Sequence, residues 1–156
     1  MTTQSSSVRP YSLTPSTATW FPAATSLTGT LTSTGIRIVG TGTSFRTEIN
    51  VGDYLVDATN IARRVVDVVD DNLLRVDSAF TAPLVAATCT RVRTLVCRQL
   101  SVVFDTNNGT IQEASQDTPV TWEAGIEFKT PSSTQSYMTP ICFTAGAGGG
   151  YVTETI

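Results

Sequence analysis

Two glycines separated by one threonine, in the run Gly40-Thr41-Gly42-Thr43, give the spacing in this sequence that comes nearest to a phosphate-binding loop. Such loops hold an anion with the backbone amides that begin a helix, and a P-loop adds a lysine at a fixed spacing. Neither a lysine nor a long amphipathic pattern follows Thr43. The run 145–150, AGAGGG, leads directly into a strand pattern, so we expect both stretches to form turns or close backbone contacts.

Acidic residues gather at two further places. Asp67, Asp70 and Asp71 suggest a calcium loop, but the D-x-[DN]-x-[DN]-G pattern and its closing glutamate are missing, so we expect a solvated hairpin turn. Glu123 and Glu127 are of the residue types that form an acid–base pair, yet on either side of a turn they would be outward-facing charges. We expect no catalytic residue and no metal ligand at either place.

The chain has no histidine, which excludes catalytic triads built on histidine and most zinc sites. Its three cysteines, Cys89, Cys97 and Cys142, lack the paired spacing of a metal site, and an odd number cannot pair completely within one chain. Buried free thiols are the simpler interpretation, and a disulfide within the chain or to a neighbouring subunit is the alternative. We predict that the protein is not an enzyme and needs no cofactor.

Composition limits both the fold and the partners. With 156 residues, the chain suits one medium domain or two small ones. The net charge of −3 leaves no positive surplus for phosphates or anionic lipids, so we expect neither nucleic acid nor a membrane as a partner. The sequence is rich in threonine, a β-branched residue typical of strands, and predicts an all-β protein. No basic and then apolar leader pattern follows Met1, so we expect a soluble protein made in a cytoplasm.

Residues 1–25 are rich in serine, threonine and proline. They also carry Tyr11, Trp20 and Phe21, which a fully solvated tail has little reason to hold. We therefore predict an extended N-terminal arm that docks through these aromatic side chains. Both its own domain and a neighbouring subunit are candidate targets, so the three residues are candidates for anchoring one subunit to another.

Two β modules are predicted after the arm. Residues 26–93 show short strand patterns separated by turn signals, including a hairpin around Asp70-Asp71-Asn72, as in a small barrel. Residues 94–156 begin with a long apolar run, pass a strong turn at 105–109 and continue as further short strands, as in a sandwich. We expect two small antiparallel β-barrel or β-sandwich units.

The stretch 32–82 resembles a small β module found in structural proteins of tailed bacteriophages. The shared pattern is a strand, V-G-x-G-T-x-F, a polar turn, G-D-x-[apolar], a strand ending in V-x-x-V, and L-x-V-D-x-A-F. In this chain the pattern is carried by Val39, Gly40, Gly42, Thr43, Phe45, Gly52, Asp53, Tyr54, Val65, Val68, Leu74, Val76, Asp77, Ala79 and Phe80.

The C-terminal part looks like a second phage-associated β unit. The central feature of that resemblance falls on Pro119, Val120, Thr121, Trp122 and Ala124. The run 145–150 departs from it, because this chain has a longer glycine-rich stretch where the unit has a tight turn.

The resemblance implies a virion structural protein, made in the cytoplasm of a bacterial host and assembled in many copies. We expect a capsid decoration protein, a trimer or other ring, whose partners are further copies of itself and major capsid or neck and tail subunits. A neck, collar or tail protein is the alternative within this class. A host-surface recognition module is a different class, in which loops such as 145–150 and 132–135 would bind a glycan. Exposed strand edges and an aromatic arm also favour assembly by strand addition or arm exchange.

Overall fold

The computed structural model describes residues 8–94, 99–130 and 139–155 of the chain. Strands dominate these ranges, and the single helix within them, α1 (Phe45–Glu48), is one turn long. The all-β class predicted from composition is therefore confirmed. No helix in the described ranges has the length and apolar character that crossing a membrane requires.

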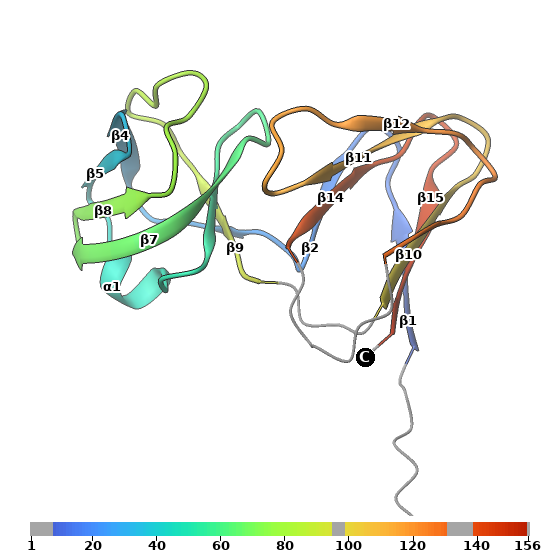
Figure 1. Ribbon diagram of the computed structural model, residues 1–156, viewed down its shortest axis with the longest axis horizontal. Helices are drawn as coiled ribbons and strands as arrows, with labels where there is room; N and C mark the ends of the chain where they lie inside the picture. Colours follow the sequence, from blue (N-terminus) through green and yellow to red (C-terminus); the bar gives the residue numbers. More distant parts are fainter. Residues whose placement is uncertain (1–7, 95–98, 131–138, 156) are drawn as a thin grey trace, which may run out of the picture.

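The fold contains two modules that lie beside each other along the long axis of the molecule (Figure 1). The barrel module is one antiparallel sheet with the strand order β3-β9-β6-β7-β8-β5-β4. Its strands are β3 (Thr25–Ser26), β4 (Thr30–Thr34), β5 (Arg37–Thr41), β6 (Tyr54–Val56), β7 (Ala62–Asp70), β8 (Leu73–Val76) and β9 (Thr90–Val92).

Alternating buried and exposed residues curl this sheet around a core. In β4 and β5 every second residue is buried, so Leu31 and Ile38 point inward. A bridge between Leu31 and Ala87 joins β4 to the segment that leads into β9, which brings the two edges of the sheet together. The enclosed core consists of Leu27, Leu31, Ile38, Phe45, Ile49, Leu55, Val65, Leu74, Val76, Phe80, Leu84 and Cys89.

Two bulges in β7 explain its irregular valine pattern. The register with β8 shifts between Val65 and Asp67 and again between Val68 and the end of the strand. Each extra residue resets which side chains face inward. Val65 and Val68 therefore both contact the barrel core although they lie three residues apart, while Val66 is exposed.

The sandwich module consists of two four-stranded antiparallel sheets, with the orders β1-β15-β10-β13 and β12-β11-β14-β2. Its strands are β1 (Val8–Leu13), β2 (Ala18–Phe21), β10 (Gln99–Phe104), β11 (Gly109–Glu113), β12 (Val120–Trp122), β13 (Phe128–Lys129), β14 (Ile141–Thr144) and β15 (Gly150–Thr155). The core between the sheets consists of Leu13, Phe21, Leu100, Val102, Phe104, Ile111, Ile141, Phe143, Ala145 and Val152.

The N-terminal strands belong to this sandwich, so the prediction of an extended arm over residues 1–25 is wrong for residues 8–21. β1 pairs with β15 along its whole length, and β2 pairs with β14. Serine and threonine, which suggested a solvated arm, also suit strands, and Pro10 is tolerated because β1 is an edge strand. Residues 1–7 lie outside the described ranges.

The barrel module is consequently an insertion between two parts of the sandwich. It occupies the range predicted for the first module to within two residues, whereas the sandwich combines the range 99–155 with β1 and β2. The chain enters the barrel through β3 and leaves it through β9, and these two strands pair with each other. A third cluster joins the modules and consists of Trp20, Val56, Ala62, Val92, Ala114 and Cys142.

Replacement of Phe21 by alanine tests whether β2 is part of the sandwich. The Phe21 ring is buried, with ring centroids 5.3 Å from Tyr11 and 5.7 Å from Phe143. We expect Phe21→Ala to lower the free energy of unfolding by about 3–5 kcal/mol, measured by urea denaturation. The control Val85→Ala, at a side chain that is 80% exposed, is expected to change it by less than about 0.5 kcal/mol. Equal effects of the two changes would support a free arm.

Candidate functional site

The Gly40-Thr43 run forms the end of β5 and the bend after it, and the Thr43 side chain packs closely against Gly40. A Cβ added to Gly40 would collide with the side chain of Thr43, and Gly42 has a φ of +68°, which favours glycine. The Thr43 hydroxyl donates to the carbonyl oxygen of Asp71 at 2.6 Å. The run leads into α1, which is too short to present a helix N-terminus to an anion. The predicted turn role agrees with this geometry.

The other residues of the phage-like pattern also have structural roles. Phe45 and Val76 are completely buried in the barrel core. The Asp53 carboxylate accepts the backbone N–H of Asn50 at 2.8 Å, and the Asp77 carboxylate accepts that of Arg64 at 3.0 Å. The pattern therefore specifies a scaffold, and its residues do not gather into a polar site.

The acidic residues near the β7–β8 turn close that turn. Asp70 accepts the backbone N–H of Asn72 at 2.7 Å, and Asp71 accepts that of Arg46 at 3.0 Å. The predicted hairpin is confirmed, because β7 and β8 pair up to the turn. Among the described residues, no group of three or more metal-binding side chains gathers anywhere.

Two of the three cysteines lie in different clusters and are free. Cys89 is buried in the barrel core and Cys142 in the cluster between the modules. Burial raises the pKa of the Cys89 thiol to about 11 and that of Cys142 to about 12, because a thiolate is poorly solvated in an apolar interior. The alternative of a disulfide between Cys89 and Cys142 is therefore wrong. Cys97 lies outside the described residues.

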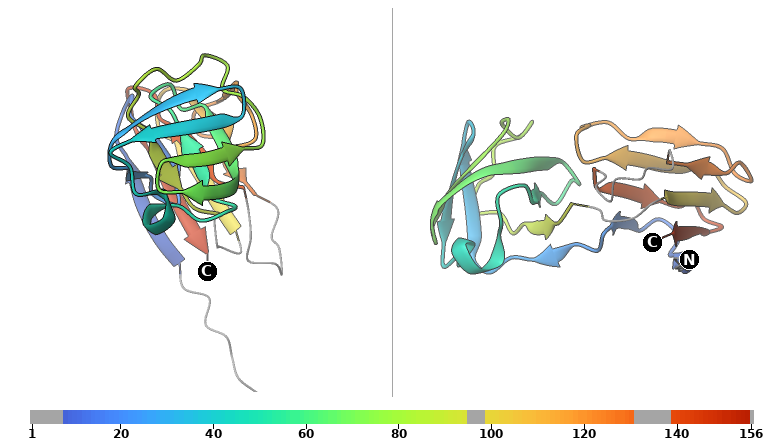
Figure 2. Two further views of the ribbon diagram at one scale, coloured as in Figure 1. Left: turned by 90° about the vertical axis from the view of Figure 1, so that its left-hand side faces the viewer. Right: turned by 60° about the horizontal axis from the view of Figure 1, so that its bottom comes forward.

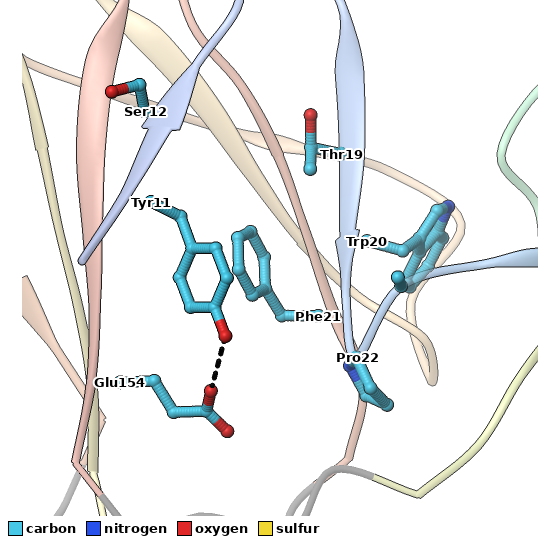
Figure 3. Close-up of a pocket in the computed structure, with 8 residues that line it drawn as sticks. Tyr11, Ser12, Thr19, Trp20, Phe21, Pro22 and Glu154 are labelled. Atoms are coloured by element: carbon cyan, nitrogen blue, oxygen red, sulfur yellow. Dashed lines mark hydrogen bonds between the residues drawn. The ribbon is translucent and has the colours of Figure 1, made fainter. Parts of the chain in front are cut away.

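The predicted anchoring residues line a groove between the edge strands β1 and β2 (Figure 3). The groove has a volume of about 350 Å³. Figure 3 shows the rings of Tyr11 and Phe21 next to each other, with Trp20 directed away from them. The Tyr11 hydroxyl donates to Glu154 of the neighbouring strand β15 at 3.2 Å, on the β1 side of the groove.

The side chains of Trp20 and Phe21 thus pack inside their own chain. Their side chains are 5% and 7% exposed, and the Trp20 indole N–H donates to Asn60 of the barrel module at 3.2 Å. Anchoring of a neighbouring subunit through these two side chains would require the sandwich core, which holds Phe21, and the cluster between the modules, which holds Trp20, to open. Of the three candidates, only Tyr11, at 38% exposure, offers surface to a partner.

Arg63 and Asp117 form a charged contact between the modules. Arg63 lies on β7, and its guanidinium donates to both carboxylate oxygens of Asp117 at 2.5 and 2.7 Å. The Thr81 hydroxyl donates to the same carboxylate at 2.8 Å. The Arg63 guanidinium and, to a smaller extent, Thr81 lower the pKa of Asp117 to about 2, and the bond to Asp117 raises the pKa of Arg63. A bidentate pair of this kind fixes direction as well as distance.

Further polar bonds and apolar packing surround this contact. The Gln112 side chain donates to the backbone oxygen of Asn60 at 3.0 Å. Tyr54 packs against the cluster between the modules, and desolvation raises the pKa of its hydroxyl although the charge of Arg64 acts in the opposite direction. The modules are therefore held in one orientation by several bonds that act together.

Three turns gather at the end of the sandwich that lies away from the barrel, and we call them the distal tip: residues 105–108, 123–127 and 145–149. The direction of β14 shows which end of the sandwich this is. Ile141, at its start, pairs with Phe21 next to the connection to the barrel, whereas Thr144, at its end, pairs with Ala18 at the far end. The turns pack closely, because a Cβ on Gly146 would lie 2.6 Å from the Cβ of Asn107.

Hydrogen bonds from backbone N–H groups join the turns of the distal tip. Asp105 donates its N–H to Gly149 at 3.1 Å, and Ala124 donates to the Asn108 side chain at 3.1 Å. Glu123 and Glu127 both lie in this tip, and Glu127 pairs with Lys129 at 3.4 Å. The loop 132–135, named as a candidate for glycan binding, lies outside the described residues.

The contact of Arg63 with Asp117 gave no signal in the sequence. The two residues are 54 positions apart in the sequence. Neither lies in a sequence pattern that indicates a buried or paired charge. Their meeting depends on how the second module packs on the first, which local patterns do not encode.

In comparisons with known proteins, no family model, no curated protein and no solved structure matches this chain.

Replacement of Asp117 by asparagine tests the contact between the modules. The depressed pKa means that the charged pair adds stability above the ordinary pKa of an aspartate, near 4, and that this addition is lost as the pH falls towards 2. We expect Asp117→Asn to cost about 1 kcal/mol in the free energy of unfolding at pH 6, because the carboxylate is partly exposed. The difference from the natural protein should vanish near pH 2. A constant difference at both pH values, or the same loss in Asp105→Asn, would contradict the assignment.

The two buried thiols should resist alkylation. At pH 8 almost none of either thiol is ionised, since their pKa values are about 11 and 12. We expect iodoacetamide to leave Cys89 and Cys142 unmodified in the native protein and to modify both in urea, as mapped by peptide mass spectrometry. Rapid modification of either residue in the folded protein would show that its surroundings are open.

Proposed function

We propose that this chain is a structural component of a tailed-phage virion and that it decorates the capsid as a repeated subunit. Its partners would be further copies of itself and the major capsid protein, and it would act through surface contacts instead of catalysis. No nucleic acid, membrane or cofactor takes part in this proposal.

The observation that carries the proposal is the barrel module. Its phage-like pattern supplies the core residues and the turn residues of one compact unit, which is what a recurring structural module requires. Among the pattern residues, Phe45, Leu74 and Val76 are completely buried. A pattern that specifies packing supports a role in construction, because none of these positions presents chemistry to a substrate.

The sandwich supports a role in assembly. The strands at the edges of its two sheets are β1 and β13 in one sheet and β12 and β2 in the other. Val120 and Ile126 near β12 are about half exposed, and Tyr151 on β15 is 56% exposed. Sheet edges and exposed apolar side chains are the features through which β proteins add neighbours. A neck, collar or tail protein would use the same features and remains the alternative location.

Host recognition is a second candidate, and the distal tip favours it. Loops clustered at one end of a sandwich are a common way for β proteins to present a binding surface on a rigid frame. The tip has exposed amide and carboxylate groups, such as those of Asn107 and Asp105. Such groups form hydrogen bonds with sugar hydroxyls.

Antibody labelling of phage particles tests the proposed location. An antibody raised against the purified protein should label the capsids of particles whose genome encodes this chain, in many copies per particle, as seen by electron microscopy. Label confined to the neck or tail would favour the alternative location. Particles that contain the chain in no detectable amount by mass spectrometry would refute the proposal, and particles of an unrelated phage serve as the control.

Binding to host cells separates recognition from decoration. Purified protein should not bind cells if it acts only in the capsid. Binding that is lost in Asn107→Ala, but kept in Val85→Ala on the barrel module, would favour recognition by the distal tip.

A further inference from the structure

We propose that copies of this chain associate head to tail, with the outer end of the barrel module of one copy docked on the distal tip of the next. This inference deepens the proposed function, on which it rests for the idea of a repeated subunit. It assigns the partner, a second copy, and the two surfaces that meet.

The outer end of the barrel is an exposed sheet face formed by β4, β5 and β8. Figure 2 shows these strands facing the viewer when the molecule is seen from its barrel end. The residues that point outward alternate with buried ones along each strand. We call this surface the end face and define it by Thr32, Thr34, Arg37, Val39 and Arg75.

Two arginines lie directly opposite each other on the end face. The register pairs Arg37 of β5 with Arg75 of β8, and Thr34 of β4 follows on the other side of Arg37. Like charges in opposed positions of a sheet repel each other. Asp67 is opposite Arg75 on β7, but neither arginine forms an ion pair with a carboxylate of the described residues. Carboxylates from a partner would remove this repulsion.

The distal tip carries the complementary charge. Asp105 and Glu123 are exposed there and form no ion pair within the described part of the chain. Their turns are adjacent, because Gly125 donates its backbone N–H to Phe104 at 2.8 Å. The three turns of the tip contain no lysine or arginine.

The charges of the two modules differ in the same direction as those of the end face and the distal tip. Residues 26–93 hold seven arginines and seven acidic residues, whereas the sandwich ranges 8–21 and 99–155 hold two basic residues, Arg9 and Lys129, and six acidic residues. The basic end face therefore belongs to a neutral module, and the acidic tip belongs to a module with a negative surplus. Charge alone steers two such ends together in solution.

The end face also has the composition of a contact surface. Val39 is 37% exposed and lies opposite Thr32 of β4, and arginine with β-branched side chains offers apolar area together with hydrogen-bond donors. The end face and the tip lie at opposite ends of the molecule (Figures 1 and 2). Two different surfaces that meet in this way produce a ring if the rotation closes, and an open chain if it does not.

Sedimentation velocity of charge-reversed variants tests this contact. The natural protein should associate with increasing concentration, and the association should weaken as salt is raised. Arg37→Glu combined with Arg75→Glu should weaken self-association at least about tenfold, and so should Asp105→Lys combined with Glu123→Lys. An equal mixture of the two variants should associate again, because each altered surface then meets an oppositely charged one.

The matched control is Arg64→Glu, which reverses an exposed arginine on another face. Arg64 is the cross-strand partner of Tyr54, which packs towards the sandwich. This control should associate as the natural protein does, and circular dichroism should show that all variants are folded. A natural protein that stays monomeric at high concentration, or a mixture that fails to associate, would overturn the proposal. Either result would leave labelling of phage particles unchanged, so failure of this contact is distinguishable from failure of the proposed function.

Discussion

The pairing of β1 with β15 and of β2 with β14 is the contact on which the rest of the structure depends. Each pairing completes one sheet of the sandwich with a strand from the other end of the chain. Because successive residues of a strand face opposite sides, β2 also serves two cores at once. Phe21 fills the interior of the sandwich, and Trp20 packs in the cluster that joins the two modules. Loss of this strand would therefore affect the sandwich and its connection to the barrel together.

Local patterns in the sequence predict the barrel well and the sandwich only in part. Alternation identifies β4 and β5, and the polar Asp70-Asp71-Asn72 identifies a hairpin, because both signals act over a few residues. β1 and β2 are different. Their neighbours in the sheet lie more than a hundred residues away, and their serine, threonine and proline content is shared with solvated segments.

The surfaces of the molecule are harder to predict than its core. The glycines and acidic residues that stood out in the sequence, such as Gly42 and Asp71, have structural roles at bends and turns. Arg37 and Arg75 carry no local signal, because only the register of β5 against β8 places them opposite each other. The same holds for the distal tip, where three turns from separate parts of the chain meet. A function based on surface contacts depends on residues that strand register and tertiary packing bring together. Local patterns in a single sequence do not identify such residues.

The insertion of the barrel into the sandwich has a consequence for synthesis on the ribosome. All strands of the barrel lie between residues 25 and 92, so this module can fold as soon as that range has emerged. β1 and β2 are made before the barrel, yet their partner strands β15 and β14 are translated only after it. During that interval two unpaired strands with aromatic side chains are exposed to other nascent chains on the same messenger RNA. Before β1 and β2 pair with the C-terminal strands, they are therefore able to aggregate or to pair with strands of another copy.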